Sequence, residues 1–250
     1  MAPFYVGKGG VERVKDYDIA ADKIDNMTSR AARSLFSESY RAQFTSAMEN
    51  SNKLAFIMET STLNTTFKKG KLSSQFENIA LVLKGKETLD SERMVFGTSL
   101  GSWDTHADND SRDWFTSYCE ELDGAIGELS AEVKKQGLWD NVTIVVANEM
   151  ARTLDSNGLG TDHGWGGWDI VIGGAVRGGI QGNYPTTFRN HPYMWQRGIM
   201  VPELPREAYW KPIAEWFGVN DSAIEYVLPN VFNFDPKRHL VDVHSLFETF

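Results

Sequence analysis

The sequence predicts an α/β fold: one domain of 250 residues with a mainly parallel sheet flanked by helices. Three apolar runs, at 93–100, 141–149 and 168–176, are typical of buried strands. A strong amphipathic helix lies between the first two runs, and the order strand, helix, strand indicates a βαβ unit. The two strands of such a unit are parallel and joined by a right-handed crossover.

The N-terminal segment, residues 1–71, is expected to be a helical lead. Residues 18–59 contain no proline and carry apolar residues at helical spacing, which predicts about two helices. The polar stretch 61–71 predicts a loop. Residues 72–86 then show the amphipathic pattern of a helix, with apolar positions at Leu72, Phe76, Ile79, Ala80 and Leu83.

The predicted βαβ unit begins with the run RMVFGTSL at 93–100, which ends in a polar loop at 101–110. The helix is predicted over 111–136, because apolar residues gather on one of its faces: Trp114, Phe115, Tyr118, Cys119, Leu122, Ala125, Ile126, Leu129 and Val133. The β-branched run NVTIVVANE at 141–149 is typical of a central strand buried on both faces.

Beyond this unit the chain is predicted to loop through GTDHGWGG, residues 160–167, into the third strand. Residues 206–218 and 221–228 show short helical patterns. Pro212 is expected to open a helix at its first position, where a missing N–H costs nothing.

The composition favours a folded, soluble protein and argues against two classes of partner. There are 34 acidic and 25 basic residues, and the net charge of −9 disfavours binding to nucleic acid or to an anionic membrane. Neither a signal peptide nor an apolar run of about 18 residues is visible, so no membrane span is expected and the localisation stays unknown. The single cysteine, Cys119, is expected to be a small buried hydrophobe.

Polar side chains stand near the ends of the predicted strands, where ligands collect in open parallel sheets. They are Asp104 and His106, Glu149 and Arg152, and Asp162 and His163. Carboxylates and imidazoles without thiolates suit divalent metal ions such as Zn, Mn, Ca or Mg, and two clusters could hold two ions. Arg152 would then clamp the oxygens of a phosphate or sulfate ester.

Each of these groups also has an ordinary structural interpretation. Aspartate and histidine in loops often cap turns or face water. Glu149 and Arg152 could simply form an ion pair. The residues alone leave both interpretations open.

Three runs in order carry a family resemblance: GTSLGSWDTHAD, then VTIVVANEMARTLDSNGLGTDHGWGGWDIVIGGAVRGGIQGNYP, and finally IAEWFGV with VLPNVFNF. Over residues 72–234 the chain resembles the DUF1501 family and, through it, the alkaline phosphatase and sulfatase superfamily. The resemblance implies a sheet flanked by helices with a two-metal site at the strand ends. By motif it implies metal ligands at Asp104, His106, Glu149, Asp162 and His163, and catalytic roles for Arg152 and Thr153.

The resemblance is to the C-terminal part of that family, with residues 235–250 as a tail. The N-terminal elements that supply the superfamily's first metal-binding aspartate and its nucleophile have no counterpart here, nor does the export signal that family members often carry. The resemblance implies a metal-dependent hydrolase of small anionic esters, either active or degenerate. The alternative is a pseudoenzyme that binds a protein partner as a structural or assembly subunit.

Overall fold

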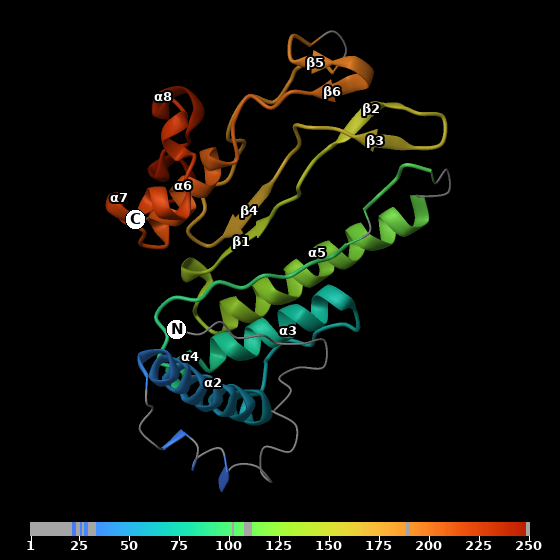
Figure 1. Cartoon of the computed structure of the whole chain (residues 1–250). Coiled ribbons are helices and arrows are strands. Elements are labelled where there is room, and N and C mark those ends of the chain that lie inside the picture. Colours follow the sequence, from blue (N-terminus) through green and yellow to red (C-terminus); the bar gives the residue numbers. More distant parts are fainter. Residues whose placement is uncertain are drawn as a thin grey trace. The chain divides into compact units, whose positions relative to one another are not determined.

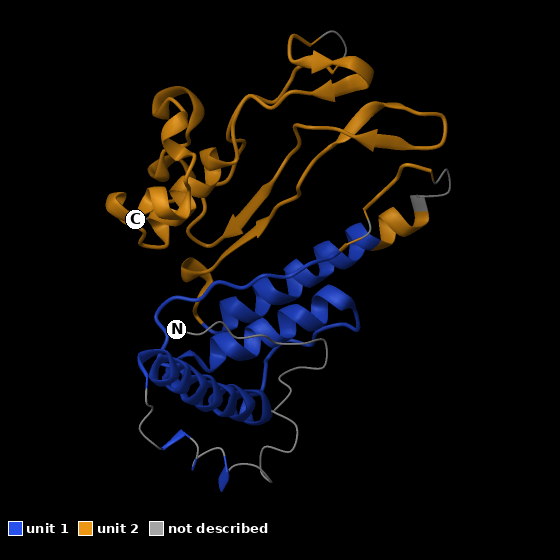
Figure 2. Cartoon of the chain, in the orientation of Figure 1, with its two compact units in different colours: residues 1–100, 118–136 blue, residues 101–117, 137–250 orange. Residues whose placement is uncertain are grey.

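The chain is described by a computed structural model at residues 22–23, 26, 28–29, 34–101, 103–107, 112–188 and 191–248. This part of the chain is mostly helical, with small antiparallel sheets (Figure 1). It divides into two compact units (Figure 2): unit 1 is Met1–Leu100 with Tyr118–Gln136, and unit 2 is Gly101–Ser117 with Gly137–Phe250. The single-domain organisation expected from the sequence stays a prediction.

Unit 1 is helical. Its elements are α2 (Leu35–Thr60), α3 (Lys71–Lys84), α4 (Lys86–Leu89) and the part of α5 (Arg112–Lys135) from Tyr118 onward. The core joins α2 to α3 and α4 through Leu54, Ile57, Val82 and Leu89. The chain between α3 and α4 passes so close to α2 that a Cβ at Gly85 would lie 2.5 Å from the Ile57 side chain.

These helices follow the sequence closely. The helices predicted at 72–86 and 111–136 are confirmed by α3 with α4 and by α5. Of the helices predicted over 18–59, α2 confirms the part from Leu35, where Ser34 caps the helix by accepting a hydrogen bond from the Ser37 amide. Most of the remainder lies outside the described residues.

Carboxylates on α5 bind the polar groups of unit 1. Glu121 Oε1 accepts from the amide of Leu72 at 2.8 Å, in the first turn of α3. Glu132 is fully buried and accepts from the Asn64 amide at 2.9 Å, so it holds the loop after α2. These bonds satisfy amides that would otherwise have no partner inside the unit.

Unit 2 contains three two-stranded antiparallel sheets and short helices. The pairs are β1 (Thr143–Val146) with β4 (Ile170–Gly173), β2 (Arg152–Ser156) with β3 (Thr161–His163), and β5 (Met194–Trp195) with β6 (Ile199–Met200). The main helices are α6 (Glu207–Trp216), α7 (Asp221–Val227), α8 (Pro236–His239) and α9 (Val243–Leu246). Ala175, Ile213, Val243, Leu246 and Phe247 form one buried core cluster, against which Val145 and Val171 of the first pair also pack.

The prediction of a mainly parallel sheet was wrong. Residues 93–100 form no strand, and most of their side chains are exposed. The strand at 143–146 pairs instead with 170–173 in antiparallel register, with Val146 opposite Ile170. Strand β1 is half-buried along its whole length and is not a central strand. An apolar run in the sequence favours a strand, but it does not specify which other strand will pair with it. That choice depends on tertiary packing.

Pro212 lies inside α6 and not at its start. A proline there leaves the carbonyl of Ala208 without its helical donor. The amide of Val241 donates to this carbonyl at 3.0 Å. The segment between α8 and α9 therefore satisfies the acceptor that the proline frees.

Two further expectations concern the surface. Among the described residues no helix is both long enough and apolar enough to cross a bilayer, as expected from the sequence. Cys119 is exposed on α5, so the expectation that it is buried was wrong. Its place on the apolar stripe of the helix did not bring it into the core.

Candidate functional site

The β2–β3 hairpin is shaped by the sequence Asn157-Gly158. The Asn157 side chain accepts from the amides of Leu159 and Gly160 at 2.9 and 2.8 Å, and Gly158 takes a φ of +99° that favours glycine. The resulting turn sets the register of the hairpin and places Arg152 opposite His163. The Asn157-Gly158 turn thus brings together Arg152 and His163, which are 11 residues apart in the sequence.

The segment 103–107 lies along this hairpin. The Thr161 amide donates to the Thr105 carbonyl at 3.0 Å, and the hydroxyls of these two threonines are 2.7 Å apart. A Cβ at Gly160 would lie 1.7 Å from the Thr105 carbonyl oxygen, so the close approach requires glycine. Asn157 also donates to the His106 carbonyl at 2.9 Å. The predicted D-T-H and D-H motifs therefore meet.

Asp104, His106 and His163 form the candidate metal cluster. One ligand atom from each of the three side chains can be chosen so that all lie within 4.8 Å of one another. The two imidazole rings are in edge contact, with centroids 4.4 Å apart. Nδ1 of His106 is hydrogen-bonded to Oδ1 of Asp104. One carboxylate and two imidazoles are a donor set that zinc and similar transition metals prefer.

Arg152 fastens the cluster to the hairpin. Its Nη2 donates to Oδ1 of Asp104 at 2.8 Å and to the Trp103 carbonyl at 3.3 Å, and its Nη1 donates to the Thr161 carbonyl at 3.0 Å. The carboxylate partner of this arginine is Asp104, and not Glu149, whose pairing with Arg152 was one of the two interpretations that the residues left open. Arg152 is therefore a structural link between two segments as well as a local positive charge.

The electrostatics keep Asp104 ionised. Partial burial raises the pKa of its carboxyl, but the hydrogen bonds from Arg152 and His106 outweigh this and leave the pKa below its ordinary value. A carboxylate that stays charged at neutral pH is ready to bind a cation or to hold an imidazole in a fixed orientation.

Asp162 lies beside the cluster with partners of its own. Its Oδ1 accepts from Asn157 at 2.8 Å and lies 4.0 Å from Nε2 of His106, while its Oδ2 is paired with Arg197. The bond from Asn157, opposed by partial burial and helped by Arg197, lowers the pKa of Asp162. Asp162 is thus an ionised neighbour of the cluster.

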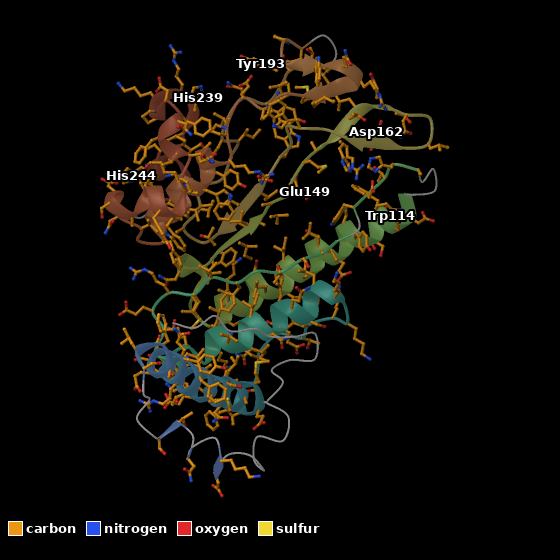
Figure 3. The ribbon with its side chains drawn as sticks, in the orientation of Figure 1. Trp114, Glu149, Asp162, Tyr193, His239 and His244 are labelled. Carbon is orange, nitrogen blue, oxygen red and sulfur yellow. The ribbon has the colours of Figure 1, made fainter. Side chains whose placement is uncertain are left out.

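Two predicted site residues have other surroundings. The buried Thr153 hydroxyl donates to the Asp155 carbonyl at 2.9 Å and accepts from the Asp162 amide at 3.1 Å, so it stabilises the hairpin. Glu149 is exposed in a bend after β1 and does not belong to the cluster. In Figure 3 it lies apart from Asp162.

Sequence reasoning missed Asn157 and Arg197. The Asn-Gly pair is a strong hairpin signal between TLDS and TDH, and it could have indicated the β2–β3 hairpin where the sequence analysis predicts a loop. Arg197 lies 35 positions beyond Asp162 in the printed numbering, in a stretch with no motif around it. No signal in the sequence alone connects it to the site.

One comparison with known proteins returned a match. A family model with the description "Protein of unknown function (DUF1501)" matches residues 15–192. The match begins well before residue 72, where the motif resemblance starts, and ends before residue 234. No curated protein and no solved structure matches the chain.

Proposed function

The chain belongs to the DUF1501 family, and on that premise we propose that unit 2 binds a divalent metal ion and hydrolyses a small phosphate or sulfate ester. The observation that carries this proposal is the convergence of Asp104, His106 and His163, whose ligand atoms lie within 4.8 Å of one another. These residues come from two segments far apart in the chain. Their meeting at the same point, beside an arginine, favours a binding site over scattered polar loops.

The donor set favours particular ions. Two imidazoles suit Zn best, whereas Ca and Mg prefer sites made wholly of oxygen atoms. In many metal sites a histidine ligand donates its other ring N–H to a carboxylate, which fixes the orientation of the ring. The bond between His106 Nδ1 and Asp104 has this form and leaves Nε2 of His106 for the ion. Asp104 would then bind the ion directly or orient the histidine that does.

In ester hydrolysis, water adds across the bond between the ester oxygen and phosphorus or sulfur, and an alcohol and phosphate or sulfate are released. A bound cation would supply Lewis acidity at the ester oxygens. Arg152 keeps Asp104 in place, and the Asp104 carboxylate holds the His106 ring. The nucleophile is left open, because the hydroxyl of Thr153 is bonded within the hairpin.

Metal content tests the proposal. The chain is loaded with zinc or manganese, desalted and measured by elemental analysis, and we expect about one equivalent, since the cluster offers a single carboxylate and two imidazoles. His163→Ala should weaken metal affinity about 100-fold or more and abolish the thermal shift caused by the metal. His244→Ala removes an exposed histidine on α9 and serves as the matched control.

Hydrolysis is measured with aryl phosphate and aryl sulfate substrates. Turnover that requires the metal and is lost in Asp104→Ala is expected. Less than about a tenth of an equivalent of metal in the unmodified chain would contradict the proposal, because a site of this kind binds tightly enough to survive desalting.

A second candidate function is the non-catalytic one, in which unit 2 binds a protein partner. Its support is the exposure of large aromatic side chains on unit 2, including Trp165, Trp168 and Trp195, each more than half exposed. Aromatic residues of this kind are enriched at protein interfaces. This candidate predicts stable co-purification with a larger complex and no turnover of either ester, with or without metal.

A further inference from the structure

We propose that Arg197, rather than Arg152, is the arginine of unit 2 that binds the anionic oxygens of a phosphoryl or sulfuryl group. The inference rests on the proposed function and names the residue that recognises its substrate. The two guanidinium groups differ in how many of their N–H donors are already bonded within the protein.

The donors of Arg152 are largely used within the protein. A guanidinium carries four hydrogens on its two Nη atoms. Those of Arg152 bind the carbonyls of Trp103 and Thr161 and the carboxylate of Asp104, and Nη1 also lies 3.5 Å from Nδ1 of His106. The side chain is only 29% exposed. To bind a substrate, Arg152 would have to give up bonds that hold the site together, so its role is positional.

Arg197 has the opposite character. Its side chain is 50% exposed, and among the described residues its guanidinium is bonded to Asp162 alone, through Nη2. The remaining N–H groups are therefore available to a ligand from solvent. An arginine in this state can offer two parallel donors to a tetrahedral oxyanion while it keeps its ion pair.

The backbone holds Arg197 over the β2–β3 hairpin. It lies in the turn η2 (Gln196–Gly198) between β5 and β6, in the left-handed region with a φ of 60°. The next residue, Gly198, packs so tightly that a Cβ there would lie 2.6 Å from Cβ of Leu154 on β2. A non-glycine residue in this conformation is strained, and such strain is concentrated at binding sites, where the surrounding structure maintains it.

Asp162 links Arg197 to the metal cluster. One oxygen of its carboxylate is paired with Arg197, and the other lies 4.0 Å from Nε2 of His106. A phosphoryl or sulfuryl group has several oxygens, so one oxygen can contact a cation while another accepts from the guanidinium. The candidate metal cluster and Arg197 therefore lie on either side of one carboxylate.

The test measures anion binding directly. Inorganic phosphate, and separately inorganic sulfate, is titrated by calorimetry into the full chain, first without metal and then after zinc loading and desalting. Arg197→Asn is the main variant because asparagine tolerates the left-handed turn, so the fold is retained while the guanidinium is lost. We expect it to weaken binding of the preferred anion about tenfold or more. The preferred anion identifies a phosphate or a sulfate ester as the substrate.

Three variants frame this result. Arg197→Lys keeps the charge without the planar fork and should recover part of the affinity. Arg152→Gln loses the bonds to Asp104, Trp103 and Thr161, so it should lower zinc affinity and the stability of unit 2, which Arg197→Asn should leave unchanged. Arg238→Gln removes an equal charge from an exposed position on α8 and should leave the affinity unchanged.

The outcomes separate the two proposals. Unchanged anion affinity in Arg197→Asn overturns this inference, while zinc binding keeps the proposed function. A chain that holds no zinc but binds phosphate through Arg197 overturns the proposed function and leaves the anion site intact. No binding of either anion by the unmodified chain up to about 10 mM overturns the inference, since a dissociation constant above that limit is too weak for a dedicated anion site.

Discussion

At Gly160 an added Cβ would lie 1.7 Å from the Thr105 carbonyl oxygen, a distance that no van der Waals contact allows. Gly160→Ala should therefore push the 103–107 segment away from the hairpin and destabilise unit 2 by about 1–3 kcal/mol. Metal affinity should fall with it, because Asp104 and His106 move relative to His163. The measurement is urea unfolding together with a zinc titration.

Gly127→Ala is the matched glycine control for that experiment. Gly127 lies in α5 with nothing within 4 Å of an added Cβ. Because alanine is the better helix former, this variant should gain about 0.5–1 kcal/mol of stability and bind zinc normally. Equal stability of the two variants would show that Gly160 is not constrained by Thr105.

Glu132 gives unit 1 a pH dependence. Burial raises the pKa of its carboxyl, but hydrogen bonds from Gln136, Thr65 and the Asn64 amide outweigh this and lower the pKa in the folded chain. A depressed folded-state pKa contributes stability that is complete above the unfolded value of about 4.3 and is lost as pH falls through the folded value.

The prediction is tested by urea unfolding at about pH 7, 4 and 3, a range that brackets the ordinary pKa of a glutamate. Glu132→Gln should be less stable than the unmodified chain at neutral pH, and the difference should shrink in acid as the native carboxyl becomes protonated. A difference that stays constant over this range would show that the charge of Glu132 contributes nothing to stability.

On the scale of single residues, the sequence identified a good part of the candidate site. Asp104, His106 and His163 were chosen for their donor chemistry, and the structure brings them together. Glu149 was chosen because it follows a predicted strand, and it lies outside the cluster because β1 does not belong to a parallel sheet. Arg197 could not be found, since only the turn between β5 and β6 brings it to Asp162.

On the scale of elements, α3 begins without a capping side chain of its own. Its N-cap residue is Gly70, and the amide of Leu72 in the first turn donates instead to Glu121 on α5. A carboxylate at this end of a helix also complements the helix dipole. One helix of unit 1 thus supplies the cap that the sequence of another lacks.

Glu121→Ala should lower the stability of unit 1 by about 1 kcal/mol, as for the loss of an ordinary N-cap. The adjacent Glu120 is exposed on the same helix, and Glu120→Ala is expected to change stability by less than about 0.5 kcal/mol. The free energy of unfolding from chemical denaturation compares the two. Equal effects would mean that Glu121 acts only through helix propensity.

The helices and the sheets differed in how well their sequences predicted them. Amphipathic spacing is local, so the boundaries of α3 and α5 were predicted within a few residues. Pairing between strands is not local, and the same apolar run fits a parallel or an antiparallel partner. The run at 143–146 was correctly predicted to be a strand. Its antiparallel pairing with 170–173 depends on the β2–β3 hairpin, which lies between the two strands in the sequence and reverses the chain.

On the scale of the whole molecule, a metal ion should affect the two units unequally. The cluster belongs to unit 2, so zinc should stabilise that unit by mass action and slow amide hydrogen exchange at 103–107 and 152–163. Hydrogen exchange should change little in the 61–66 loop of unit 1, where the Asn64 amide is hydrogen-bonded to Glu132. Hydrogen exchange with mass spectrometry measures both regions in one experiment. Equal protection in both units, or protection confined to unit 1, would contradict a metal site at this cluster.

The contact between Thr105 and Thr161 joins positions that are 56 residues apart. During synthesis Asp104 and His106 therefore leave the ribosome long before His163, and a partly made chain lacks a third donor for an ion. A cation cannot be captured by the whole cluster until the β2–β3 hairpin has been made and has folded against the earlier segment. Metal uptake would then mark the point at which a newly made chain has completed this part of its fold.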